Sequence, residues 1–266
     1  PGACRHCALP RPRRRLAPAI LIFTALGPAG AAHARCAGAN LIDALPAEES
    51  RALETATQAR PFAVGNLWQA QKGEQRVTLI GTYHLADDRH DALMARITPL
   101  MEGAGLLLVE AGPDEEAALK RDIAADPGLL FLTEGPSLMQ QFPPEEWAQL
   151  SNALAARNIP AIMGAKMRPW YLASVLAVPP CDMGEITAGL GLDHRVMDLA
   201  QGSGIPVRAL EPHTTVFRIF ETMTPEEQLA MLRSSLMMED RVADFSVTLS
   251  DAYFAGQSRM VWEFLR

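Results

Sequence analysis

Four short apolar runs most constrain how this 266-residue chain can fold. Each run is continuous rather than alternating, which is typical of strands covered on both faces. Amphipathic stretches separate the runs. This repeated order of strand and helix predicts an α/β fold with a central, largely buried sheet and helices on both of its faces. The runs cover residues 76–81, 105–110, 160–164 and 206–210.

Helical patterns fill most of the chain between and after these runs. They cover residues 91–102, 143–157 and 192–201, and a capping box begins at Thr224 with proline at the first helical position. After residue 211 only helical patterns are visible, so we expect a helical C-terminal segment. The last pattern reaches Arg266 without a stop signal, and we interpret the domain as C-terminally incomplete.

The first 34 residues have the pattern of an export signal. A basic stretch that ends at Arg15 is followed by an apolar run and by the small-x-small sequence Ala32-His33-Ala34. The apolar run has about 17 residues and contains prolines and glycines, whereas a membrane span needs ~20 apolar residues. We therefore predict a signal peptide over residues 1–34, a single α/β domain over residues 35–266, a periplasmic or secreted location and no stable membrane anchor.

Charge and cysteine content agree with an exported protein. The chain has 31 acidic and 24 basic residues, and five of the basic residues lie in the predicted signal peptide. An acidic mature chain disfavours nucleic acid as a partner. Of the four cysteines, Cys36 and Cys181 remain after cleavage. In an oxidising compartment such a pair is more often a disulfide, so we predict this bridge, with the two Cα atoms within ~7 Å. The alternative is two separate core residues.

A histidine and a glutamate follow the first two predicted strands. Gly81 and His84 end the first strand region, and Glu110 ends the second. Ligands of open α/β sheets bind beyond the carboxyl ends of the strands, so these two side chains are expected in one crevice. Imidazole and carboxylate together are typical ligands of zinc, manganese or iron. The alternative is a partly buried histidine that bonds to a neighbour.

Further polar residues follow the fourth run and begin two helices. Glu211 and His213, two apart on an extended segment, share a face and are candidates for further ligands or for a general base and its partner. Alternatively, Glu211 caps the next helix or pairs with an arginine. His194 follows Asp193, an expected helix N-cap, and we interpret it as structural. His90 begins a helix and is expected to face solvent.

Together these motifs resemble the TraB/GumN family over about residues 60–266. The resemblance depends on Gly-Thr-x-His ending at His84, a strand ending in Glu110, a Pro-Trp helix at residues 167–173, and Gly-Leu-Asp at residues 191–193. That family is grouped with the Tiki proteases and erythromycin esterases in a proposed metallohydrolase superfamily. Its pattern has two Gly-x-x-His motifs and a glutamate. The first motif corresponds to Gly81 and His84 and the glutamate to Glu110. The second normally lies near the C-terminus of the family, on a strand after the last long helices, and this sequence stops before that point.

The resemblance implies an exported metal-dependent hydrolase of peptide or amide bonds, with a peptide or small-molecule substrate. His84, Glu110 and His213 are the candidate ligands of a divalent ion such as Mn, Co or Zn, and Glu110 and Glu211 are the candidate catalytic residues. The metal would lower the pKa of a bound water and polarise the scissile carbonyl. Two alternatives stay open: an ester hydrolase, and a non-catalytic protein that binds a peptide or small ligand in the same crevice.

Overall fold

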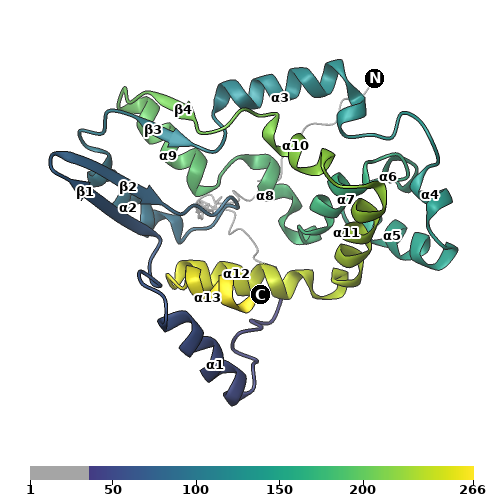
Figure 1. Ribbon diagram of the computed structural model, residues 1–266, viewed down its shortest axis with the longest axis horizontal. Helices are drawn as coiled ribbons and strands as arrows, with labels where there is room; N and C mark the ends of the chain where they lie inside the picture. The colour runs from purple at the N-terminus through teal and green to yellow at the C-terminus, as the bar shows by residue number, and fades with distance from the viewer. Residues whose placement is uncertain (1–35) are drawn as a thin grey trace, which may run out of the picture. The chain divides into compact units, whose positions relative to one another are not determined.

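The computed structural model describes residues 36–266, whose elements are labelled in Figure 1. The described residues, 36–266, belong to one compact unit. The fold is mixed α/β and 57% helical, which confirms the predicted α/β class. The predicted signal peptide and its cleavage site lie outside the described residues. Within the described part of the chain, no helix combines the length and the apolar composition that a membrane span requires.

Two small sheets replace the single sheet that the sequence predicts. β1 (Leu67–Lys72) and β2 (Gln75–Ile80) form an antiparallel hairpin. β3 (Leu107–Val109) and β4 (Val207–Ala209) form a parallel pair. Among the described residues no ladder joins β2 to β3, so the prediction of one central sheet is wrong. Apolar runs show where strands form, but they do not show which strands pair.

Helices make up most of the described chain. The prediction of a helical C-terminal segment is confirmed, and the capping box at Thr224 is present, with its Oγ accepting from the backbone N–H of Glu227 at 3.2 Å. The helices are α1 (Ala47–Gln58), α2 (His90–Met101), α3 (Pro113–Ala125), η1 (Pro127–Leu129), α4 (Leu138–Gln141), α5 (Pro144–Ala156), α6 (Ala161–Gly164), α7 (Pro169–Leu176), η2 (Pro180–Asp182), α8 (Met183–Ala188), α9 (Leu192–Gly202), α10 (Thr215–Glu221), α11 (Pro225–Met237), η3 (Glu239–Arg241), α12 (Val242–Phe254) and α13 (Ser258–Phe264).

The run at residues 160–164, predicted as a strand, forms the short helix α6. Pro160 precedes the helix, and its carbonyl accepts hydrogen bonds from Met163 N and Gly164 N at 2.9 and 3.1 Å. Gly164 is buried against Leu154 of α5, where an added Cβ would lie 2.3 Å from a methyl carbon of that leucine. A short apolar run fits a helical turn as well as a strand, because periodicity does not distinguish the two over five residues.

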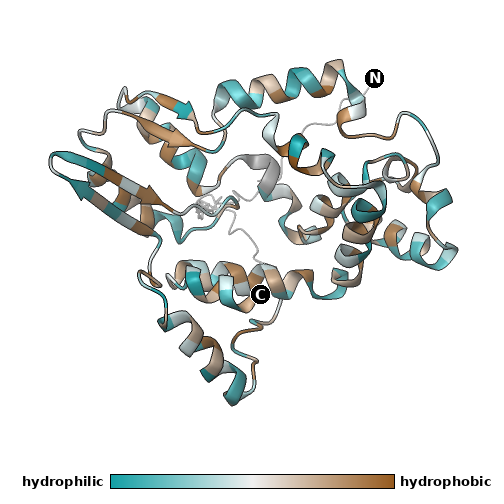
Figure 2. Ribbon diagram, viewed as in Figure 1, coloured by the Kyte–Doolittle hydropathy of each residue, from teal (hydrophilic) through white to brown (hydrophobic). Residues whose placement is uncertain are grey.

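The strands are packed on one face only, so the prediction of a largely buried sheet is also wrong. On β2, Val77 and Leu79 are 55% and 56% exposed, and on β3 Leu108 is 51% exposed. The opposite face contributes Ile80 and Leu107 to the core beneath. Figure 2 shows hydrophobic stretches along these strands. In these continuous apolar runs, therefore, only the side chains of one face are packed in the core. In the usual parallel sheet, both faces are buried.

Two hydrophobic cores support the fold. The first joins α5, α7 and α11 through fully buried leucines, among them Leu154, Leu172 and Leu232. The second joins α2 to α9 through Ile97 and Ala200 and includes partly buried side chains of all four strands or their neighbours. Because α9 is part of this second core, its first turn is held near the carboxyl ends of β2 and β3.

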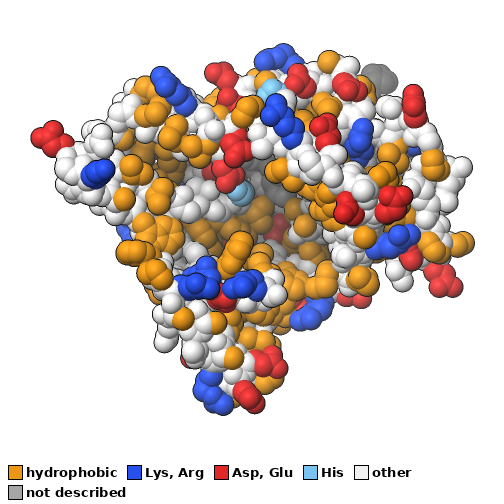
Figure 3. Space-filling model, in the orientation of Figure 1, with side chains coloured by type: hydrophobic (Ala, Val, Ile, Leu, Met, Phe, Trp, Pro, Cys, Tyr) orange, Lys and Arg blue, Asp and Glu red, His pale blue; other side chains and the backbone are white. Residues whose placement is uncertain are grey.

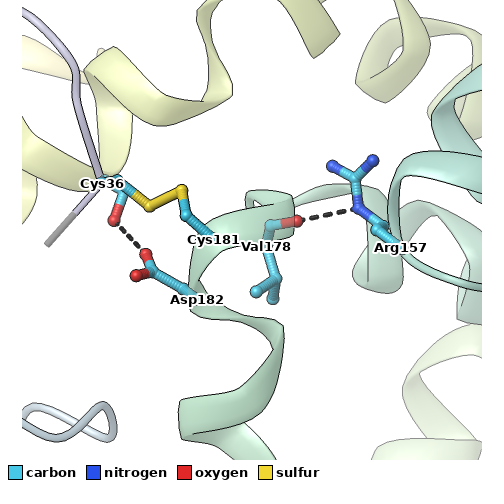
Figure 4. Close-up of a disulfide and its surroundings, with 6 residues drawn as sticks. Cys36, Arg157, Val178, Cys181 and Asp182 are labelled. Carbon is cyan, nitrogen blue, oxygen red and sulfur yellow. Dashed lines mark hydrogen bonds between the residues drawn. A yellow bond between two sulfur atoms is a disulfide. The ribbon is translucent and has the colours of Figure 1, made fainter. Parts of the chain in front are cut away.

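A disulfide between Cys36 and Cys181 ties the N-terminal segment to η2, as Figure 4 shows. The two Cα atoms are 5.5 Å apart, which confirms the predicted pairing. The segment then follows α12, where Leu41 N donates to Thr248 Oγ1 at 2.8 Å. On the other side, the buried Arg157 holds the chain just before Cys181, because its Nε donates to the carbonyl of Val178 at 2.9 Å.

Reducing this disulfide is expected to lower the free energy of unfolding by roughly 4–5 kcal/mol, because the bridge constrains a long loop in the unfolded chain. The loop spans 145 residues. Denaturant midpoints of residues 35–266 with and without reductant measure the effect. The double variant Cys36→Ser/Cys181→Ser is the control, and its midpoint must be the same in both buffers. A wild-type midpoint that is the same with and without reductant would contradict the prediction.

Candidate functional site

His84 lies in the segment that follows β2, where the start of α9 packs against it. Leu192 N donates to the carbonyl of Tyr83 at 2.9 Å. Gly191, the N-cap of α9, is so close that an added Cβ would lie 2.4 Å from the carbonyl oxygen of His84. Only glycine leaves room for this contact. The side chain of His84 itself is 63% exposed.

Asp193, in the first turn of α9, lies beside the imidazole of His84. Its Oδ1 is 3.2 Å from His84 Nδ1. The carboxylate of Asp193 raises the pKa of His84, burial opposes this, and the negative charge of Glu110 adds to the increase. Burial alone would raise the pKa of Asp193, but the neighbouring histidines lower it overall. The two side chains therefore stabilise each other's charged form.

His194 extends this pair into a chain of four side chains. Its Nδ1 is 3.1 Å from Asp193 Oδ2, and its Nε2 is 3.4 Å from Glu116 Oε1 of α3. Both ring nitrogens of His194 thus face carboxylates. The order of contacts is Glu116, His194, Asp193 and His84, so only the last side chain presents a ring nitrogen to the surface.

The carboxyl ends of β3 and β4 bring two exposed glutamates to one edge. Val109 pairs with Ala209 across the parallel ladder, and Leu210 N donates to the carbonyl of Val109 at 2.7 Å. Glu110 directly follows Val109, and Glu211 directly follows Leu210. Both glutamates are exposed. The negative charge of Glu110 contributes to the raised pKa of His84. Figure 3 shows acidic and histidine side chains at the rim of a hollow in this face of the molecule.

The structure pairs His213 with a different carboxylate. Its Nε2 is 2.7 Å from Asp122 Oδ2, near the end of α3. Within residues 36–266 no ion pair or hydrogen bond joins His213 to His84 or Glu110. The contact with Asp122 uses Nε2 and leaves Nδ1 as the ring nitrogen of His213 that could bind a metal.

A cavity on the other side of the segment after β2 does not include His84. Tyr83, Asp182, Ser246 and Ser250 contribute to its lining. Burial raises the pKa of Asp182, which accepts a hydrogen bond from Ser246 Oγ at 2.6 Å. The wall also includes Cys36, so the disulfide and this cavity belong to the same part of the fold.

The residues around His84 fit a divalent ion in their chemistry, because imidazole and carboxylate groups are suitable ligands for zinc, manganese or cobalt. Asp193 Oδ1 and His194 Nδ1 are buried without a hydrogen-bond partner, as expected where a cation could compensate them. The donor atoms are not preassembled, however. Within the described residues, the only tight group of three comprises Cys36, Cys181 and Asp182, and its sulfurs form the disulfide.

Sequence reasoning missed Asp193 and Glu116 and misjudged two helix starts. Asp193 was the expected N-cap of its helix, but Gly191 occupies that position, which leaves the carboxylate free to face His84. His90 is fully buried, so the prediction that it faces solvent is wrong. The available signal was Gly191-Leu-Asp-His194, a second Gly-x-x-His sequence that places an acid beside a histidine.

The model of the TraB/PrgY/gumN family matches residues 66–266, and the chain belongs to this family. The match includes His84, Glu110, Asp193 and Glu211. Searches against curated proteins and against solved structures found no match.

Replacing Gly191 by alanine is expected to destabilise the protein by about 1–3 kcal/mol, because the new methyl group forces the start of α9 away from the backbone of His84. Gly202→Ala at the other end of α9 is the matched control, since an added Cβ there meets nothing within 4 Å. Thermal unfolding of both variants measures the difference. Equal melting temperatures would contradict the close contact at Gly191.

The burial of His90 makes stability depend on pH. His90 begins α2, its Nε2 lies 2.9 Å from the carbonyl oxygen of Leu85, and its Nδ1 has no hydrogen-bond partner. Burial lowers its pKa below 6.5, while the charge of Asp87 raises it and the charges of Arg195 and Arg89 lower it further. As the pH falls below 6.5, the unfolded chain takes up this proton before the folded chain does.

We therefore expect the free energy of unfolding to decrease below pH 6.5, and to decrease less in His90→Gln. The glutamine amide can still donate to Leu85 but does not titrate. Denaturant unfolding of both proteins between roughly pH 5 and pH 8 measures how steeply the free energy of unfolding of each depends on pH. Histidine is the side chain whose ordinary pKa lies in this range. The contribution of His84 cancels in the comparison. Identical slopes would argue against a buried neutral His90.

Proposed function

We propose that the protein is an exported metal-dependent hydrolase of peptide or amide bonds. The main observation in its support is the arrangement of side chains at the carboxyl ends of β2 and β3. There, the exposed His84 is backed by Asp193 and influenced by the charge of Glu110. An accessible imidazole near carboxylates is suited both to holding a metal and to moving a proton. Membership of the TraB/PrgY/gumN family agrees with this proposal.

In this proposal His84 and Glu110 hold the divalent ion. When bound, the ion would supply an activated water and polarise the carbonyl of the substrate. Glu110 and Glu211, which follow the carboxyl ends of the paired strands β3 and β4, are the carboxylates that accept and return protons. His213, whose Nε2 contacts Asp122, would be a further ligand through its Nδ1.

The exposure of the site is compatible with a substrate as large as a peptide. The side chain of His84 is open to solvent, and both glutamates lie on the surface. The same openness admits a small molecule or an ester. These alternatives share the site and differ in the bond that is cleaved.

Export is the second part of the proposal. The disulfide between Cys36 and Cys181 supports it, because structural disulfides persist in oxidising compartments and are rare in the cytosol. The predicted signal peptide ends just before Cys36, so cleavage after Ala34 would leave the bridge intact. Periplasmic or secreted material is therefore the form to study.

Metal analysis tests the catalytic part of the proposal. Residues 35–266 are loaded with Zn²⁺, Mn²⁺ or Co²⁺, dialysed, and analysed for metal and for cleavage of an unstructured peptide. We expect stoichiometric metal and cleavage in the wild type, and neither in His84→Gln/Glu110→Gln. Glu102→Gln, a change at an exposed glutamate after α2, is the control. A metal-free wild type that binds the peptide without cleaving it would identify a binding protein, and cleavage of esters alone an ester hydrolase.

A further inference from the structure

We propose that Asp193 is a positioning residue, whose carboxylate keeps the proton of His84 on Nδ1 and leaves Nε2 as the reactive ring nitrogen. Its role in metal binding rests on the proposed function, whereas the position of the proton does not. Nothing in the sequence motif Gly-x-x-His assigns a partner to the histidine. The structure supplies one from a helix far along the chain.

The geometry around His84 distinguishes its two ring nitrogens. Nδ1 is 3.2 Å from Asp193 Oδ1. Within residues 36–266, Nε2 has no hydrogen bond or ion pair, and the side chain is largely exposed. A carboxylate beside one imidazole nitrogen favours the proton on that nitrogen, so the lone pair is on the other. Nε2 is thus the atom that can ligate a metal or accept a proton.

Asp193 is held so that it cannot easily turn away. Its backbone belongs to the first turn of α9, which the Leu192–Tyr83 hydrogen bond and the close approach of Gly191 fix against the segment of His84. Its Oδ2 faces His194 Nδ1 at 3.1 Å. Its Oδ1 is buried and makes no hydrogen bond, and His84 Nδ1 lies 3.2 Å away, so the N–H of His84 is a donor that can satisfy it.

His194 and Glu116 lie on the side of Asp193 that faces away from His84, and they help to hold its carboxylate in place. His194 has a carboxylate at each ring nitrogen, Asp193 on one side and Glu116 of α3 on the other. Both of its ring nitrogens thus face carboxylates, although Nδ1 makes no hydrogen bond, and His194 acts on His84 through Asp193. Carboxylates that hold a histidine from its far side orient the ring and make it a better ligand, and they commonly matter as much as the ligand itself.

The position of the proton can be measured without metal or substrate. In the metal-free protein, at a pH where His84 is neutral, ¹⁵N NMR of the imidazole distinguishes Nδ1–H from Nε2–H, and His84→Gln assigns the signal. We expect Nδ1–H in the wild type, a shift toward Nε2–H in Asp193→Asn, and recovery of Nδ1–H in Asp193→Glu. Asp198→Asn, at an exposed position of the same helix, is the matched control and should match the wild type.

The wild-type spectrum decides the proposal even if Asp193→Asn does not fold. A dominant Nε2–H form in the wild type would overturn it, and so would identical spectra of folded Asp193→Asn and Asp198→Asn. His194→Gln offers a milder test, because it releases Oδ2 and should increase the Nε2–H fraction.

Calorimetric titration with Zn²⁺ separates this inference from the proposed function. We expect Asp193→Asn to bind about 10–100-fold more weakly than the wild type, and Asp198→Asn to bind equally well. If no variant binds Zn²⁺ but the wild type has Nδ1–H, the metal-dependent function is wrong and the positioning role is upheld. If Zn²⁺ binds equally to folded Asp193→Asn and wild type, the positioning role in metal binding is overturned.

Discussion

The contact between Gly191 and the backbone of His84 is the constraint on which the candidate site depends. It brings the N-terminus of α9 against the segment after β2 so closely that no side chain fits between them. The first turn of the helix then places Asp193 beside the imidazole and His194 behind Asp193. A small shift of this helix would separate the carboxylate from the histidine, since their contact depends on one turn of backbone.

The second core gives that contact its stability. Ile97 of α2 and Ala200 of α9 are fully buried, and residues of the strands pack against them from the sheet side. The core of α5, α7 and α11 is separate from this one and contains none of the candidate site residues. Substitutions in the first core should therefore change stability as a whole, whereas those between α2 and α9 should also change the geometry at His84.

Local features of the sequence were predictable because they depend on neighbouring residues. The capping box at Thr224 and the helical C-terminal segment are examples, since proline, threonine and glutamate act within one turn. The pairing of β3 with β4, the helical state of residues 160–164, and the position of Asp193 were not predictable. Each depends on contacts with distant parts of the chain. His84 and Glu110 could be named as candidates from their places at strand ends, but the support behind His84 required the fold.

The position of the disulfide has a consequence for how the molecule assembles. The bridge closes a covalent loop from Cys36 to Cys181, and this loop contains His84 and Glu110 but not Asp193, His194 or Glu211. Closing this loop therefore cannot organise the site by itself, however early in folding the two cysteines are oxidised. The site forms only when the chain beyond Cys181 docks and β4 joins β3 in parallel. Contacts between such distant residues are slow to form, so the chemistry-bearing residues should come together late in folding.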